Sequence, residues 1–535
     1  MHELKFEQPI DNRLMSWKDP MRKISFFWYV LAVVLVGALL ISLNLPLVGS
    51  KSVDLAHHYA LVFRLTENWS LTPNDPSLGE MNIYPRGSHL AAAFVGKLVG
   101  SAFLGMHIVA LGALVMIWVA ILAILYAAPK RTGPANALVM ALVVVLNFGA
   151  FRIHGSEISN NYFFAQLVAQ SMAMAVIAIA IHLEARHRKS LAYAILLGAI
   201  WLITGVHLLP AVELLGLLAG LLVLDVAFLE VPQQERARKA FLACLILAGG
   251  IALVVLHPAF AAMRSIANNN GDIRLGPLAP VWSVGLVALG ALWCSLSLIR
   301  AWRRDPVGYL MYKYLAVYGA AVSCLCLTQI VLDLFHIGSD YAAKKYAFGV
   351  VTFLFMRLAL WLGSKLTLAA ASRPRWAKLG HPASAVPVFA LALFATAASA
   401  AKERHDIDTW AVVNFEHQLT HLPASAVPMP ASGRQNFVME LRGMPNVVNY
   451  MFSLSVAHTA REHSEMVLLG QPAAKPLPFA EMGTILTSRY NVRFAEAPLC
   501  AVAYGADLEA VSAMCADRLA GAALALPQPV TPDAR

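Results

Sequence analysis

The stretch "GMHIVALGALVMIWVAILAILYAA", residues 105–128, contains no charged side chain. About 20 predominantly apolar residues are enough for a helix to cross a bilayer, so this stretch predicts a transmembrane helix. Ten further runs of similar character lie at 25–48, 134–151, 162–183, 191–208, 211–229, 240–258, 280–299, 314–336, 346–363 and 384–400. The sequence therefore predicts an all-α polytopic membrane protein with about eleven transmembrane helices.

The composition agrees with this class, because 59% of the residues are hydrophobic and only 13% are charged. The formal net charge of +10 does not indicate nucleic-acid binding. In membrane proteins, excess Lys and Arg usually lie in cytoplasmic loops. The first run, 25–48, ends in "LNLPLVGS", which is a poor cleavage site for a signal peptide, so we interpret it as an uncleaved helix.

The distribution of basic residues predicts the orientation. With the N-terminus inside, the inner segments carry 21 Lys and Arg residues and the outer segments up to Lys345 carry 9. This asymmetry favours a cytoplasmic N-terminus, and eleven crossings then place the C-terminus outside. We expect a cytoplasmic tail at 1–24, a transmembrane domain at 25–400 and a soluble extracytoplasmic α/β domain at 401–535. The expected location is a bacterial inner membrane.

The C-terminal region has a different character from the rest of the chain. The segments "ILTSRYNVRFA" (485–495) and "LCAVAYG" (499–505) look like short strands, and "DLEAVSAMCADRLAGAAL" (507–524) looks like a helix. Cys500 and Cys515 both lie in this region. An oxidising outer compartment favours their pairing, so we expect a disulfide between them.

The first outer loop, residues 49–104, has its own pattern. "KSVDLAHHYALVFRLTENW" begins at Lys51 and predicts an amphipathic helix over 55–67 that lies on the membrane surface. A second surface or half-buried helix follows in "SHLAAAFVGKLVGSAFLG", with Ser88 as its N-cap. "GKLVG" (96–100) matches a small-residue helix-packing pattern.

Asp54 is the most informative position of this loop. One interpretation is that it caps the N-terminus of the helix at 55–67. The other is that its carboxylate acts as a general base at the membrane–water boundary and takes a proton from an acceptor hydroxyl. His57 and His58 follow one turn later, and "YPRGSH", Tyr84 to His89, adds a third histidine. We expect these histidines and Tyr84 to contact the substrate.

This arrangement resembles the C-type glycosyltransferase superfamily: an acid after the first span, a long outer loop, many spans and an outer C-terminal domain. "YPRGSH" resembles a Tyr-Pro-x-Gly-x-His element of some bacterial members. The resemblance implies an enzyme that transfers a sugar from a polyprenyl-phosphate carrier, with Asp54 at the position of the catalytic acid. The sugar would be a pentose such as arabinose, or a hexose, and the acceptor a lipid, glycan or protein. "DLA" lacks the adjacent second acid of many members, which fits monophosphate donors without metal better.

The second outer loop, "RIHGSEISNNYF", offers Arg152, His154 and Glu157. In the superfamily this loop often adds an acid to the site, so the resemblance makes Glu157 a second catalytic candidate and His154 a substrate contact. A solvated loop is the alternative. The histidines and the two acids also have the chemistry of divalent-cation ligands, although they come from separate loops.

A lipid-phosphate donor needs fixed positive charge near the interface. "HIGSDYAAKKYAFG" offers Asp340 and Tyr341 for polar contacts and two lysines before the next span. His207, in "TGVHLLP", either contacts a phosphate or ends a helix. The basic candidates are Arg86, Arg264, Arg274, Lys344 and Lys345. Simple snorkelling of the lysines is the alternative to a groove for the donor near Asp54.

Two other functions remain open. A transporter or lipid flippase would place charges within its spans, but the spans hold few: Glu213, Asp225 and Asp333. The polar residues gather at one face instead, which favours chemistry at an interface. A glycan polymerase or ligase of the O-antigen type would carry arginine-rich outer loops, whereas the outer arginines here are scattered. We expect sugar donor, acceptor and membrane lipids as partners, and no nucleic acid.

Overall fold

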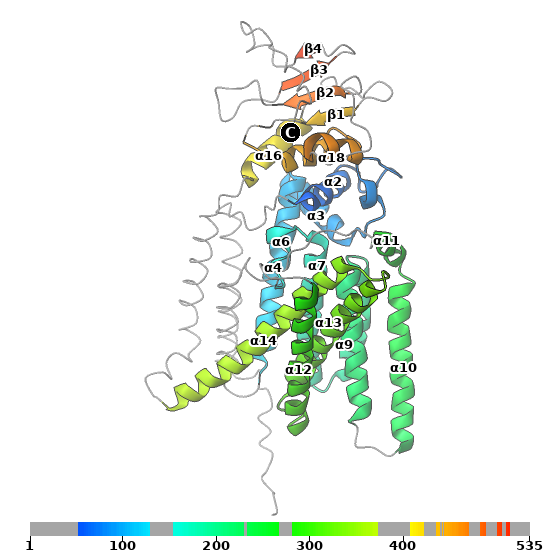
Figure 1. Ribbon diagram of the computed structural model, residues 1–535, viewed down its shortest axis with the longest axis vertical. Helices are drawn as coiled ribbons and strands as arrows, with labels where there is room; N and C mark the ends of the chain where they lie inside the picture. Colours follow the sequence, from blue (N-terminus) through cyan, green and yellow to red (C-terminus); the bar gives the residue numbers. More distant parts are fainter. Residues whose placement is uncertain are drawn as a thin grey trace, which may run out of the picture. The chain divides into compact units, whose positions relative to one another are not determined.

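The computed structural model describes residues 52–128, 153–228, 233–266, 281–372, 407–421, 441 and 443–469, together with the strand residues 435–438, 482–487, 500–504 and 510–513. It is largely helical (Figure 1). Seven of the described helices are long and apolar enough to cross a membrane. The protein is therefore a polytopic membrane protein.

The spans fall where the apolar runs predict them. The seven segments are Ala102–Tyr126, Phe164–Ala185, Leu208–Ala227, Gln233–Val255, Ser283–Arg304, Leu310–Leu334 and Tyr341–Leu366. The run at 191–208 forms a shorter apolar helix, Lys189–Thr204. The runs at 25–48, 134–151 and 384–400 lie outside the described residues, so the full number of eleven stays a prediction.

The chain divides into two compact units. We call Met1–Leu39, Ala113–Ser156 and Ala169–Ala398 the bundle unit. We call Leu40–Gly112, Glu157–Val168 and Ser399–Arg535 the loop unit. Residues 49–104, which the sequence places in the predicted transmembrane domain, share the loop unit with the C-terminal region.

The bundle unit consists of packed helices. α12 lies beside α13, α13 packs against α9 and α14, and α9 packs against α8 and α10 (Figure 1). Their bounds are α8 Lys189–Thr204, α9 Leu208–Ala227, α10 Gln233–Val255, α12 Val281–Arg304, α13 Leu310–Leu334 and α14 Asp340–Ser372. A short helix, α11 (Pro258–Ile266), follows α10. α10 exposes Phe241, Leu242, Leu245 and Ile251, as expected of side chains that face lipid.

The loop unit is built around α2 (Val53–Asn68), in which every residue from Leu55 to Leu65 is buried. The expectation of a surface helix was therefore wrong. α2 packs against α3 (Gly87–Val99) and α17 (Asn446–Ser455), so its apolar side chains contact protein rather than lipid. α3 is half-buried, with Leu90, Phe94 and Leu98 exposed.

Two buried charged side chains connect the C-terminal region to the first loop. Glu416 of α16 (Thr409–Thr420) accepts hydrogen bonds from Ser101 Oγ and from the backbone N–H of Ala102, at 2.7 Å, where α4 (Ala102–Tyr126) begins. A carboxylate at this position satisfies free N–H groups and complements the helix dipole. Arg64 of α2 donates to the backbone carbonyl of Leu454 at 3.0 Å, at the end of α17.

A four-stranded sheet follows in the order β1 (Gln435–Val438), β2 (Met482–Thr487), β3 (Cys500–Tyr504) and β4 (Ala510–Ala513). β1 and β2 are parallel and the other pairs are antiparallel. β4 lies in the segment for which the sequence predicted a helix. Pairing with β3 overrides the local helix preference of this alanine-rich segment. Cys515 lies outside the described residues, so the disulfide stays a prediction.

Gly105 marks a close contact between α3 and α4. A Cβ atom at Gly105 would lie 2.5 Å from the Ala92 carbonyl oxygen and 2.5 Å from Gly96 Cα. These atoms are backbone and cannot rotate away. The small-residue pattern at Gly96 thus has a packing partner in α4.

We expect Gly105→Ala to separate α3 from α4 and to lower the free energy of unfolding by about 1–3 kcal/mol, as overpacking usually does. Thermal unfolding of the purified protein in detergent measures the change. Gly112→Ala is the matched control, because it lies on the same helix and a Cβ there meets nothing within 4 Å. Equal shifts for both variants would contradict the contact.

Candidate functional site

The N-terminus of α2 positions Asp54. Ser52 is the N-cap, and its side chain accepts a hydrogen bond from the backbone N–H of Asp54 at 3.2 Å. The interpretation of Asp54 as the N-cap was therefore wrong. Its carboxylate lies in the first turn, where the helix dipole favours a negative charge.

The segment Tyr84–His89 leads into α3. Arg86 occupies the N-cap position of that helix, so the prediction of Ser88 as N-cap was wrong by two residues. Ser88 and His89 are buried in the first turn. Arg86 is exposed, and its guanidinium donates to the carbonyl of Asn82 at 3.2 Å.

A histidine pair joins α2 to α3. His58 Nδ1 and His89 Nε2 are 2.9 Å apart, so one ring donates its N–H to the other. The Tyr84 ring lies edge-on to both, with centroid distances of 5.6 Å to His58 and 5.6 Å to His89. Burial raises the pKa of Tyr84, and the nearby charge of Asp54 raises it further. The structure thus brings three predicted residues into contact, His58, Tyr84 and His89, and the charge of a fourth, Asp54, acts on Tyr84.

Burial of His89 makes this cluster sensitive to acid. Burial lowers the pKa of His89 to about 3, whereas an unfolded histidine titrates near 6.5. Between these values the unfolded chain binds a proton that the folded protein does not. The stabilisation by neutral His89 is therefore complete above about pH 6.5 and declines as the pH falls toward 3.

We expect His89→Gln to weaken the loss of stability on acidification, by about 1–2 kcal/mol between pH 7 and pH 5. Thermal unfolding at these two pH values, in the wild type and the variant, checks it. His417→Gln makes the same change at an exposed position of the loop unit and is the control. An unchanged pH dependence in His89→Gln would show that the buried imidazole is not responsible.

His57 belongs to a second network, which includes the C-terminal region. His57 Nε2 lies 2.7 Å from the Tyr450 hydroxyl of α17, and that hydroxyl donates to Glu465 Oε1 at 3.1 Å. Arg461 Nε donates to the same carboxylate at 2.7 Å. Because the Tyr450 hydroxyl donates its proton to Glu465, it accepts its other hydrogen bond from His57, so His57 Nε2 carries a proton.

The charge of Glu465 is well stabilised. Burial alone would raise its pKa, but the His57 ring, 3.7 Å away, and the hydrogen bond from Arg461 outweigh this effect and lower the pKa to about 2. Glu465 and Arg461 lie four residues apart on α18 (Arg461–Leu469). Tyr450, Arg461 and Glu465 were not among the residues predicted from the sequence. The only signal for them was the i,i+4 charge pair in "REHSE".

Glu157, the second acidic candidate, also lies in the loop unit. It is fully buried at the start of the short helix α6 (Glu157–Asn160). Its backbone carbonyl accepts a hydrogen bond from the N–H of Phe163 at 3.1 Å.

In the bundle unit, His207 and Lys345 lie near each other. His207 is the N-cap of α9, and its Nδ1 accepts from the N–H of Leu209 at 3.3 Å. Burial and then the charge of Lys345 hold the pKa of His207 well below its usual range. The buried Lys345 ammonium lies 4.2 Å from the centroid of the Tyr341 ring. Lys345 and Tyr341 are thus in contact near the start of α14, and the charge of Lys345 acts on His207 at the N-terminus of α9.

The other predicted residues of the bundle unit have separate positions. His154 is buried, with Nε2 2.7 Å from the Tyr318 hydroxyl and its backbone N–H donating to Thr352 Oγ1 at 2.8 Å, so it joins helices within the bundle. Arg264 is exposed on α11 and Lys344 is half-buried. Asp340 begins α14, and Arg274 lies outside the described residues.

Within the described part of the chain, no three or more His, Cys, Asp or Glu side chains are grouped so that they could hold a metal ion. The histidines pair with each other and with tyrosines instead. Comparison with known proteins adds no family, since no family model matches this sequence and no curated protein matches it.

Proposed function

We propose that this protein is a membrane glycosyltransferase that transfers a sugar from a polyprenyl-phosphate carrier to a lipid, glycan or protein acceptor. The observation that supports it best is the position of Asp54. Its carboxylate lies in the first turn of α2, where its charge raises the pKa of Tyr84, and the Tyr84 ring packs edge-on against the His58–His89 pair. A carboxylate near hydrogen-bonding rings suits a general base, which takes a proton from an acceptor hydroxyl.

The proposed reaction is a substitution at the anomeric carbon of the donor sugar. The acceptor oxygen forms a bond to that carbon, and its proton passes to the Asp54 carboxylate. The bond from the anomeric carbon to the phosphate oxygen breaks, and polyprenyl phosphate leaves with the electron pair. His57 and His58 would orient the acceptor, and Glu157 is the alternative base.

A leaving phosphate needs positive charge, and in the bundle unit Lys345 is the candidate for such a contact, with the His207 ring as a second candidate. The buried Lys345 ammonium lies 4.2 Å from the centroid of the Tyr341 ring. Lys344, Arg86 and Arg264 are further candidates for the phosphate, and Tyr341 and Asp340 for the sugar. We propose that the reaction takes place at the extracytoplasmic face of a bacterial inner membrane.

A transporter is the second candidate, because of a buried acid within a span. Gln170 of α7 (Phe164–Ala185) donates its amide to Glu213 of α9 at 3.1 Å, and both side chains are buried. Ionisable residues within spans often mark the path of a transported ion or solute.

One assay separates the two functions, because catalysis survives in detergent whereas transport requires two compartments. Purified protein in detergent is mixed with polyprenyl phosphate that carries a labelled pentose or hexose, and with a membrane extract as acceptor. The proposal predicts label in the acceptor and release of polyprenyl phosphate. Absence of both products across pentose and hexose donors would contradict it and favour the transporter.

A further inference from the structure

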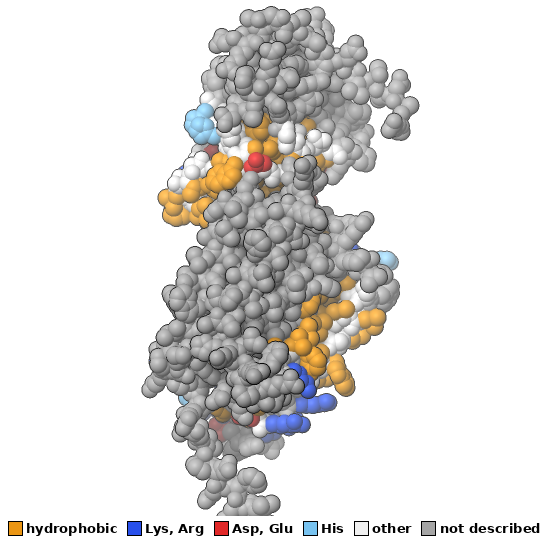
Figure 2. Space-filling model, turned by 90° about the vertical axis from the view of Figure 1, so that its left-hand side faces the viewer, with side chains coloured by type: hydrophobic (Ala, Val, Ile, Leu, Met, Phe, Trp, Pro, Cys, Tyr) orange, Lys and Arg blue, Asp and Glu red, His pale blue; other side chains and the backbone are white. Residues whose placement is uncertain are grey.

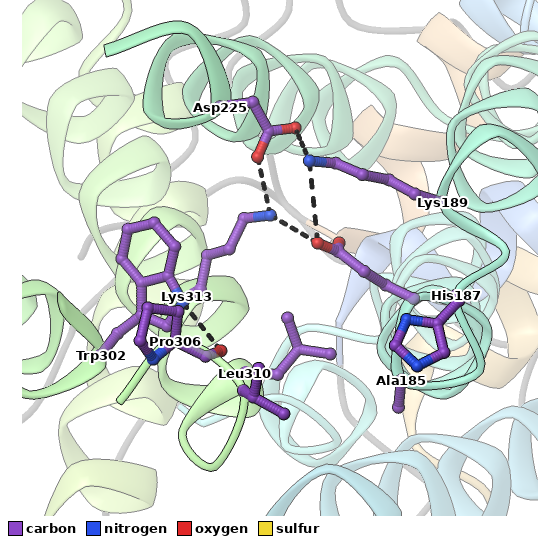
Figure 3. Close-up of a pocket in the computed structure, with 10 residues that line it drawn as sticks. Ala185, His187, Lys189, Asp225, Trp302, Pro306, Leu310 and Lys313 are labelled. Atoms are coloured by element: carbon purple, nitrogen blue, oxygen red, sulfur yellow. Dashed lines mark hydrogen bonds and ion pairs between the residues drawn. The ribbon is translucent and has the colours of Figure 1, made fainter. Parts of the chain in front are cut away.

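A cavity of about 360 Å³ lies among helix ends of the bundle unit (Figure 3). α7 ends at Ala185, α8 begins at Lys189, α9 ends at Ala227, and α12 and α13 are joined through residues 305–309. Residues at these helix ends and in the connection between α12 and α13 line the cavity. The sequence-based orientation places this end of the spans at the cytoplasmic face.

One half of the cavity is charged. Lys313 is 2% exposed, and its ammonium lies 2.8 Å from Glu184 Oε1 and 3.0 Å from Asp225 Oδ1. Lys189 also pairs with Asp225, and lies 3.9 Å from Glu184. Tyr314 donates to Glu184 at 2.6 Å. Two lysines thus neutralise two carboxylates, and the buried acids leave no negative charge to repel an anion.

Lys189 differs from Lys313 in its access to solvent. Its side chain is 41% exposed. Figure 3 shows Lys189 and His187 on one side of the cavity. An anion that enters can therefore approach the Lys189 ammonium without displacing Lys313 from its two carboxylates.

The other half of the cavity is apolar and consists of Trp302, Pro306, Val307 and Leu310. The Trp302 indole N–H donates to the Pro306 carbonyl at 3.2 Å, which leaves the ring as an apolar wall. Val307 is 54% exposed. Hydrocarbon that enters the cavity would remove the exposed Pro306 and Val307 from water.

The surroundings carry excess positive charge. Residues 184–189, Asp225 and residues 300–313 together contain seven Lys and Arg side chains but only three carboxylates. Arg186, Arg188, Arg303 and Arg304 are exposed. On the face drawn in Figure 2, Lys and Arg side chains directly border exposed hydrophobic side chains. Such a border is the expected environment of an anionic headgroup and its acyl chains.

We propose that this cavity binds an anionic phospholipid, with the phosphate beside Lys189 and His187 and an acyl chain against Trp302, Val307 and Leu310. An anionic phospholipid and a soluble phosphate compound share the phosphate group that would bind here. The apolar half and the position at the ends of the spans favour a lipid over a soluble phosphate. This inference does not depend on the proposed glycosyl transfer.

Native mass spectrometry of the delipidated protein in detergent tests the proposal. The probes are phosphatidylglycerol and phosphatidylethanolamine with identical acyl chains. We expect the wild type to retain phosphatidylglycerol preferentially, and Lys189→Ala to reduce this retention about fivefold, the usual effect of one basic residue on an anionic lipid. Val307→Trp, which fills the apolar half from an exposed position, should reduce the retention of both lipids.

Lys239→Ala is the matched control, because Lys239 is a basic residue of α10 that does not line the cavity and pairs with Glu235 at 3.2 Å. It should leave lipid retention unchanged. Equal losses in Lys239→Ala and Lys189→Ala, or no loss in either cavity variant, would overturn the proposal. If millimolar inorganic phosphate displaces the lipid completely, the natural ligand is a soluble phosphate and the assignment to a lipid is wrong. Thermal unfolding confirms that each variant is folded.

Discussion

Asp54→Asn should reduce sugar transfer at least about a hundredfold, because base catalysis typically contributes 10²–10⁴-fold. Asn has nearly the same shape as Asp but cannot accept a proton at neutral pH. Ser52 remains the N-cap, so α2 keeps its start. The loss should therefore appear in transfer and not in folding. Donor binding should survive, since an amide repels a phosphate less than a carboxylate does.

The measurement is the initial rate of label transfer from the polyprenyl-phosphate donor, together with thermal unfolding of the same preparations. Glu67→Gln is the matched control, because it removes a carboxylate from the other end of α2. That variant should retain nearly the parent rate. His57 and His58 variants should lose less than Asp54→Asn. A near-parent rate in Asp54→Asn would exclude Asp54 as the base and make Glu157 the next acid to replace.

Arg64→Met should produce the largest loss of stability, about 3–5 kcal/mol, because it leaves a partly buried carboxylate without its partner. Arg64 is 7% exposed, and its Nε donates to Asp75 Oδ2 at 3.2 Å. Its two Nη atoms donate to the carbonyls of Leu454 and Ser455. Without the guanidinium, these carbonyls at the end of α17 lose their donors.

Unfolding in denaturant, with detergent held constant, measures this effect. Arg86→Met is the control, because Arg86 is exposed and donates to one carbonyl at 3.2 Å. The double variant Arg64→Met, Asp75→Asn should lose less than Arg64→Met alone, since it also removes the unpaired charge. Equal losses in the Arg64 and Arg86 single variants would show that the buried network does not stabilise the loop unit.

The spans were predictable because their signal is local. A run such as 105–128 needs no partner to be recognised, and α4 covers nearly the same residues. The environment of α2 was not predictable in this way. An amphipathic pattern specifies an apolar face, but it does not distinguish lipid from α3 and α17 as the surface that covers this face. The prediction of Asp54 as the N-cap of α2 was wrong because Ser and Asp are both preferred at N-caps, and Ser52 and Asp54 lie only two positions apart.

The site was predictable only in part, for the same reason. His58, Tyr84 and His89 lie within one loop, so their short separation made a cluster a reasonable prediction. Tyr450 is 393 residues from His57, and no local pattern connects them. The charges around Lys313 were also missed as a group, because Glu184, Asp225 and Lys313 lie on three different helices.

The hydrogen bond between His57 and Tyr450 sets a minimum time for the protein to mature. A ribosome that adds 5–20 residues per second needs about 20–80 s to make the 393 residues between them. During that interval α2 exists without α17, and Arg64 has no carbonyls of Leu454 and Ser455 to bind. The newly made α2 therefore lacks one of its packing partners until α17 has been synthesised. Chains that stop before α17 would leave exposed the apolar side chains of α2 that α17 covers.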